Sequence, residues 1–94
     1  MKTYYLIILG EYSNCHYNNM IERIEQLGNT HKLLDNIYVY ESKPGDTVES
    51  VRTTLSGNDI AYCMVMEIPE GFNCAWSMTR ESSSYFKQLT EDIG

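Results

Sequence analysis

The 94-residue chain is long enough for one small domain with a single core and too short for two. Its 43% hydrophobic and 21% charged residues give no compositional case for disorder, so we expect residues 1–94 to form one folded domain. The formal net charge of −6, with seven basic residues and no basic run, argues against a general nucleic-acid binder.

The first predicted elements are a strand and a helix. Tyr4–Leu9 is rich in aromatic and β-branched residues and ends at Gly10, which predicts a central strand followed by a turn. From Tyr17 onward the apolar residues recur at helical spacing, and Gly28 ends the predicted helix.

A second strand and a second helix follow. Within residues 31–42, isoleucine and valine alternate with Tyr38 and Tyr40, which predicts one strand with two usable faces. After the turn residues Pro44 and Gly45, apolar residues at helical spacing predict a short helix closed by Gly57. Either Asp46 or Thr47 can cap its N-terminus.

The C-terminal third predicts two more strands and a final helix. Ile60–Ile68 is almost wholly apolar, as in a strand that is buried on both sides or that has a central position in the sheet. Turn residues then lead to Cys74–Met78. We expect this segment to be a short strand that can pair with the preceding strand as a hairpin. Tyr85, Phe86 and Leu89 can then pack one face of a terminal helix.

This order predicts an α+β domain with a ferredoxin-like βαββαβ plan: a four-stranded antiparallel sheet, helices on one face, and a C-terminal strand and helix as an extension. The uncovered face would carry tyrosines and methionines, and exposed apolar area commonly marks a protein interface. We therefore expect a homodimer, with Tyr38, Tyr40 and Trp76 as interface candidates and another protein as a further partner. Trp76 also fits a purely structural packing role.

Side chains that could support chemistry are sparse. Glu11 follows the first strand, where a carboxylate can bind magnesium or act as a base if a second one lies near, but a solvated loop acid is the simpler interpretation. His31 is expected at the surface. No glycine-rich nucleotide loop and no nucleophile motif occurs, so we predict neither a cofactor nor a metal.

The cysteines and the hydropathy pattern bear on the compartment. Cys15, Cys63 and Cys74 form no C-x-x-C pair, which is typical of reduced cytosolic thiols. The apolar run at the N-terminus is too short for a signal sequence, and no stretch approaches the roughly 20 apolar residues that span a bilayer. We expect a cytoplasmic protein with no membrane segment.

Several short segments, taken in order, carry a family resemblance: Tyr5–Ile8, Leu27–Gly28, Leu34–Val39, Asn58–Asp59 and Ala75–Trp76. Together they resemble the small CRISPR-associated adaptation endonuclease family, and more closely its stand-alone SinR-like bacterial relatives. The resemblance spans most of the chain and implies a ferredoxin-like subunit, a homodimer joined through its sheets and late strands, and a metal-dependent nuclease.

The resemblance fails where the family's chemistry lies. Those nucleases place an aspartate at the end of the first strand, and the two subunits hold one metal between them. This chain has Leu9 and Gly10 there, followed by Glu11, and the family's basic residues after that aspartate are replaced by residues 12–16, Tyr-Ser-Asn-Cys-His. Neither Leu9 nor Gly10 can ligate a metal through its side chain.

Two main hypotheses follow. The first is a non-catalytic homodimer that acts through macromolecular contacts, resembling an adaptation protein that has lost its metal-binding acid. The alternative is a metal-dependent endoribonuclease or endodeoxyribonuclease that uses Glu11, with Mg²⁺ or Mn²⁺, at a dimer interface. A third hypothesis, RNA stacking on Tyr38 and Tyr40 of an open sheet, ranks last because of the acidic charge.

Overall fold

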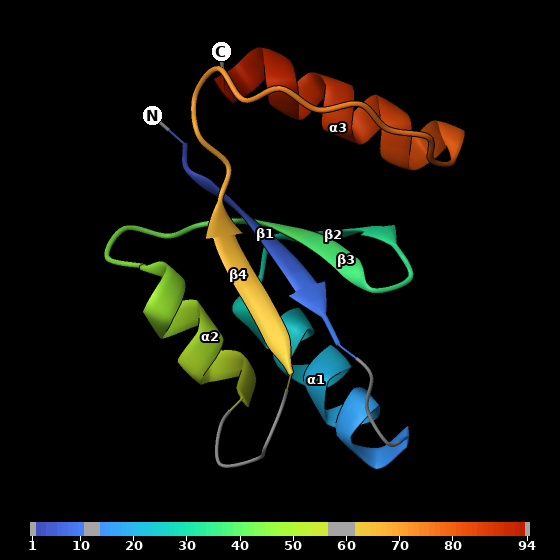
Figure 1. Ribbon diagram of the computed structural model, residues 1–94. Coiled ribbons are helices and arrows are strands. Elements are labelled where there is room, and N and C mark those ends of the chain that lie inside the picture. The colour runs from blue at the N-terminus through green and yellow to red at the C-terminus, as the bar shows by residue number, and fades with distance from the viewer. Residues whose placement is uncertain (1, 11–13, 57–61, 94) are drawn as a thin grey trace.

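The computed structural model describes residues 2–10, 14–56 and 62–93, and this part of the chain forms four strands and three helices (Figure 1). The chain is therefore an α+β protein. In order, the elements are β1 (Tyr4–Leu9), α1 (Asn14–Leu27), β2 (Thr30–Leu34), β3 (Ile37–Glu41), α2 (Val48–Ser56), β4 (Cys63–Glu67) and α3 (Arg80–Ile93).

The four strands form one antiparallel sheet in the order β2-β3-β1-β4. β1 is central, with Ile7 paired to Tyr38 of β3 on one side and to Val65 of β4 on the other. Because neighbouring strands occupy both edges of β1, its side chains project above and below the sheet, alternating between the two faces.

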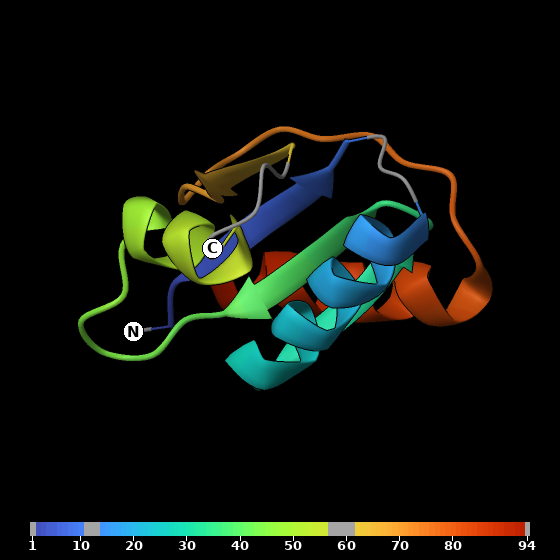
Figure 2. The ribbon, with the colours of Figure 1, turned by 90° about the horizontal axis from the view of Figure 1, so that it is seen from below.

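The first face of the sheet is covered by α1 and α2 (Figure 2). Alternate residues of β1, namely Tyr5, Ile7 and Leu9, point to this side, as the two-residue period of a strand requires. They pack in one cluster with the apolar stripes of the two helices, which include Met20 of α1 and Leu55 of α2. This cluster is the larger of the two cores.

The second face is covered in part by α3, so the expectation that this face is uncovered is wrong, whereas α1 and α2 share the first face as expected. Phe86 and Leu89 of α3 pack with Leu33 of β2 and Val39 of β3. The physical reason lies in β1: the intervening residues Tyr4 and Leu6 are also apolar, and a sheet with two apolar faces needs cover on both. The C-terminal helix is therefore part of the core.

The strand predicted within residues 31–42 from the alternation at residues 37–40 forms as β3, but β2 precedes it, so this region is a hairpin of two strands. Asp35 and Asn36 form a two-residue turn between β2 and β3, and both residues favour tight hairpin turns. The apolar pattern alone does not show this turn, because apolar residues lie on both sides of it.

The strand expected at Cys74–Met78 does not form, since the structure assigns no strand between β4 and α3. Side-chain packing holds this segment instead. Phe72 and Trp76 make edge-to-face contacts with Phe86, at centroid distances of 5.8 and 5.0 Å, and the Trp76 indole N–H donates to Ser83 Oγ at 3.0 Å. The segment thus packs against α3 without joining the sheet.

The turn before α2 is closed by a buried hydroxyl. Thr47 caps the N-terminus of α2, because its Oγ1 accepts a hydrogen bond from the Ser50 backbone N–H at 3.0 Å. The Asp46 carboxylate accepts from the Lys43 backbone N–H at 2.8 Å and from the Tyr40 hydroxyl at 2.7 Å. These two bonds, the backbone bond first, lower the pKa of Asp46. Burial and the bond to Asp46 together raise the pKa of Tyr40 to about 12.

Tyr40→Phe removes one of these bonds, and we expect the free energy of unfolding at pH 7 to fall by about 1 to 2 kcal/mol. A lowered carboxyl pKa contributes stability above its ordinary value of about 3.9, and that contribution is lost as the pH falls through the folded-state value. The difference in free energy of unfolding between wild type and variant should therefore be smaller at pH 3 than at pH 7. Urea unfolding of both proteins at each pH, at one protein concentration, measures this difference. An equal difference at the two pH values would contradict the role of the charged carboxylate.

Candidate functional site

An exposed apolar surface lies on the second face of the sheet, beside the area that α3 covers. Met64 and Met66 of β4 are 59% and 46% exposed, although they belong to an almost wholly apolar segment. They pair with Ile8 and Leu6 of β1, whose side chains share their face. Trp76, which is 38% exposed, lies at the same side of the sheet. We call Leu6, Met64, Met66 and Trp76 the apolar surface.

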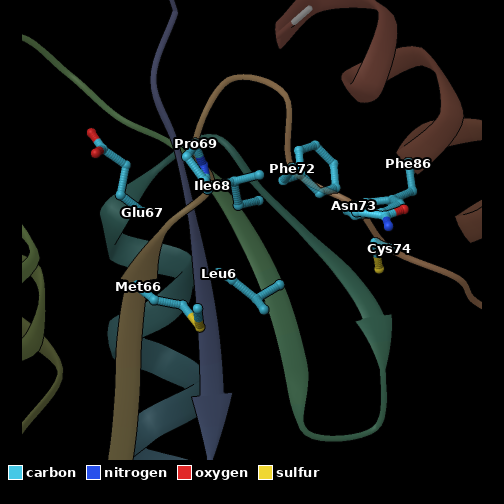
Figure 3. Close-up of a pocket in the computed structure, with 9 residues that line it drawn as sticks. All are labelled: Leu6, Met66, Glu67, Ile68, Pro69, Phe72, Asn73, Cys74 and Phe86. Atoms are coloured by element: carbon cyan, nitrogen blue, oxygen red, sulfur yellow. The ribbon is translucent and has the colours of Figure 1, made fainter.

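The apolar surface is hollowed by two cavities. The first, of about 310 Å³, is lined by Leu6 and Met66 from the sheet and by Phe72 and Phe86 on the opposite side (Figure 3). The second, of about 330 Å³, shares Leu6 and Phe86 with the first and is bounded by Trp76. The two cavities therefore lie side by side between the sheet and the segment that follows β4.

Few polar groups line the first cavity. Asn73 and Cys74 lie on the chain segment across from Leu6, while the Glu67 side chain points away from the cavity (Figure 3). A concave apolar lining with few polar groups is suited to binding an apolar side chain or ligand. Among the described residues that line this cavity, no acid is paired with a base, and the lining is suited to contact with an apolar group.

The three predicted interface residues lie in different environments. Tyr38 and Tyr40 are 7% and 1% exposed and belong to the core under α1 and α2. Trp76 remains at the surface. Because this chain's own helices cover both tyrosines, the proposed contact surface is built on Trp76 and on two methionines. The sequence predicts methionines on the open face, but only the structure shows that they are Met64 and Met66.

The end of β1, where the family's metal-binding acid would lie, is closed by packing. Leu9 is 1% exposed and belongs to the core. Gly10 donates its N–H to the Tyr62 carbonyl at 2.7 Å, and a Cβ added at Gly10 would lie 2.8 Å from Tyr62 Cβ. Glycine is thus required here for close approach of two backbones. Glu11 lies outside the described residues.

Neither a metal site nor a membrane span emerges from the described part of the chain. Within residues 2–10, 14–56 and 62–93, His, Cys, Asp and Glu side chains nowhere gather in a group of three that could hold a metal ion. None of the described helices has the length and apolar character needed to cross a membrane.

His31 is less exposed than expected. Its ring stacks on Tyr85 of α3, with centroids 4.0 Å apart and planes 7° from parallel. Local sequence patterns do not reveal this contact, because the two residues lie 54 positions apart in the chain. The stack helps to hold α3 over β2.

Comparison with known protein families, with curated proteins and with solved structures finds no match to this chain.

The closed strand end yields a prediction for Gly10→Ala. The added Cβ meets Tyr62 Cβ and the Tyr62 carbonyl oxygen, 3.1 Å away, so we expect the free energy of unfolding to fall by about 1 to 3 kcal/mol. The same change in a Tyr62→Gly background, which lacks one of the two atoms, should cost less. Chemical denaturation of the four proteins measures the coupling; equal costs in both backgrounds would show that Tyr62 does not confine Gly10.

Proposed function

We propose that the protein is a non-catalytic homodimer that acts through macromolecular contacts. The observation that carries this proposal is the apolar surface: two half-exposed methionines and a tryptophan beside two apolar cavities. Burying one such side chain contributes about 1.5 to 3 kcal/mol. A surface of this kind on a small chain is typical of an interface.

Two features of the backbone support a ferredoxin-like fold. Along the chain, β1-α1-β2 and β3-α2-β4 are two successive strand-helix-strand units. Read from the β4 edge, the sheet order is β4-β1-β3-β2, with each unit's helix on the same face. We infer a ferredoxin-like domain with α3 as an addition on the opposite face.

We further propose a distant relation to the small CRISPR-associated adaptation endonucleases, through their SinR-like bacterial relatives. The short segments that resemble this family support it. In this proposal, the chain keeps the subunit and the dimer and has lost the nuclease chemistry. The buried Leu9 and the confined Gly10 support the loss, because the strand end has neither a ligand nor space for one.

The acidic composition supports a protein partner over a nucleic acid. With a net charge of −6, the chain would be repelled by phosphate backbones on average. The apolar surface contains no charged side chain, so it fits the apolar core of a protein interface.

The dimer is tested with Met64→Glu. We expect the wild type to be a dimer at micromolar concentration and the variant to dissociate at least about tenfold more readily, since a charge then enters an apolar contact. Light scattering after gel filtration measures the mass. Gln26→Glu, which adds the same charge on the exposed side of α1, is the matched control and should remain dimeric. A monomeric wild type would overturn the proposed dimer.

The absence of catalysis is tested with the nuclease alternative. We expect no cleavage of single- or double-stranded RNA or DNA by the wild type with Mg²⁺ or Mn²⁺. Metal-dependent cleavage that is lost in Glu11→Ala, while the dimer persists, would establish the alternative in which Glu11 holds the metal. Cleavage that survives Glu11→Ala would exclude that mechanism and still overturn a non-catalytic role.

A further inference from the structure

β4 is an edge strand of the sheet, and among the described strands it pairs only with β1. The Gly10 N–H donates to the Tyr62 carbonyl at 2.7 Å, and the Ile68 N–H donates to the Tyr4 carbonyl at 2.9 Å. Even-numbered residues of this segment therefore direct their backbone groups to β1. By the alternation of an antiparallel ladder, Cys63, Val65 and Glu67 direct theirs outward.

The opposite edge of the sheet, β2, is protected, whereas no described strand pairs with the outer edge of β4. The register of β2 shifts between Lys32 and Leu34, and the Ser82 hydroxyl of α3 donates to the outward carbonyl of Lys32 at 3.3 Å. An irregular register, a lysine and a covering helix are devices that prevent edge pairing. β4 has a regular register with β1 and contains neither lysine nor proline.

The side chains of β4 are arranged so that a second β4 fits beside the first. In an antiparallel pair related by a two-fold axis at Val65, Met64 lies opposite Met66 of the partner subunit, and Cys63 lies opposite Glu67 of the partner subunit. The methionine pairs fall on the face of the apolar surface, and they would enlarge it into one continuous patch across the two copies.

Charge complementarity on the other face favours the same partner. Cys63 and Val65 pack toward α2, and Arg52 of α2 lies close enough to Cys63 for its charge to oppose the rise in the thiol pKa that burial causes. The pairing would bring Glu67 of the partner subunit opposite Cys63, and so toward Arg52. The two-fold axis repeats this attraction at the other end of the strand pair.

We propose that two copies of this chain join β4 to β4 in antiparallel register about Val65, forming a continuous eight-stranded sheet. This inference rests on the dimer proposed above and specifies its geometry. The outward backbone groups of Cys63, Val65 and Glu67 form the new ladder. The partner is a second copy because both the methionine pairs and the Arg52–Glu67 attraction are self-complementary.

Disulfide trapping tests the register. Met64 and Met66 of the partner subunit would form a non-hydrogen-bonded pair with Cα atoms about 4.5 Å apart, which is within disulfide range. Met64→Cys and Met66→Cys are purified separately and then oxidised alone and as a mixture. We expect a covalent dimer joined through positions 64 and 66 only in the mixture, identified by mass spectrometry of the unreduced digest. Its absence from a mixture that is dimeric would overturn the register.

Val65→Pro tests the ladder itself. Proline removes an N–H that points outward and leaves the β1 hydrogen bonds intact, so we expect a folded protein by circular dichroism whose dimer dissociates at least about tenfold more readily. Val65→Ala, which keeps the N–H, is the control and should dissociate less than Val65→Pro. A Val65→Pro variant that dimerises as well as the wild type would overturn edge pairing.

Charge reversal tests the attraction. Arg52→Glu and Glu67→Arg should each weaken the dimer, and the double variant should restore it, which a merely structural role of either residue does not predict. The outcomes separate the two proposals. A monomeric wild type contradicts the proposed dimer. A wild-type dimer that survives Val65→Pro and gives no disulfide between positions 64 and 66 contradicts only the edge pairing.

Discussion

The structure depends on a single constraint: every residue of the central strand β1 is apolar, and both of its edges are hydrogen-bonded. Side chains such as Ile7 and Leu9 are buried on one face, while Tyr4 is buried and Leu6 is partly buried on the other. Two helices cover the first face, but α3 alone covers the second, mainly over β2 and β3. The apolar surface over β1 and β4 is what remains uncovered.

The same strand explains why the site at its end is poor in chemistry. Leu9 is buried in the core. Gly10 lies against Tyr62 at the end of the sheet where β1 ends and β4 begins. A position that must be glycine for packing cannot also present a carboxylate. Packing of the strand end is therefore incompatible with a carboxylate side chain at position 10 in this sequence.

The two edges of the sheet differ for a related reason. α3 covers β2 and reaches its outward carbonyl through Ser82, so that edge is closed by the chain itself. β4 lies at the other edge, and its methionines are exposed on the face that α3 leaves open. An open edge and an open apolar face thus meet on one strand. This coincidence is why the proposed contact surface and the proposed strand pairing involve the same residues.

Periodicity in the sequence determined β1, the two helices that cover the first face, β4 and the terminal helix, because each has a local pattern of apolar residues. The β2–β3 hairpin was missed because its two-residue turn interrupts the apolar pattern too briefly. Only the tertiary structure decided which face is covered. Tyr38 and Tyr40 share one side of β3 in any register, and they are buried because helices cover that side. Met64 and Met66 lie in an equally apolar strand, but they are exposed. A local pattern sets which side chains share a face, and long-range packing decides whether that face meets the core or water.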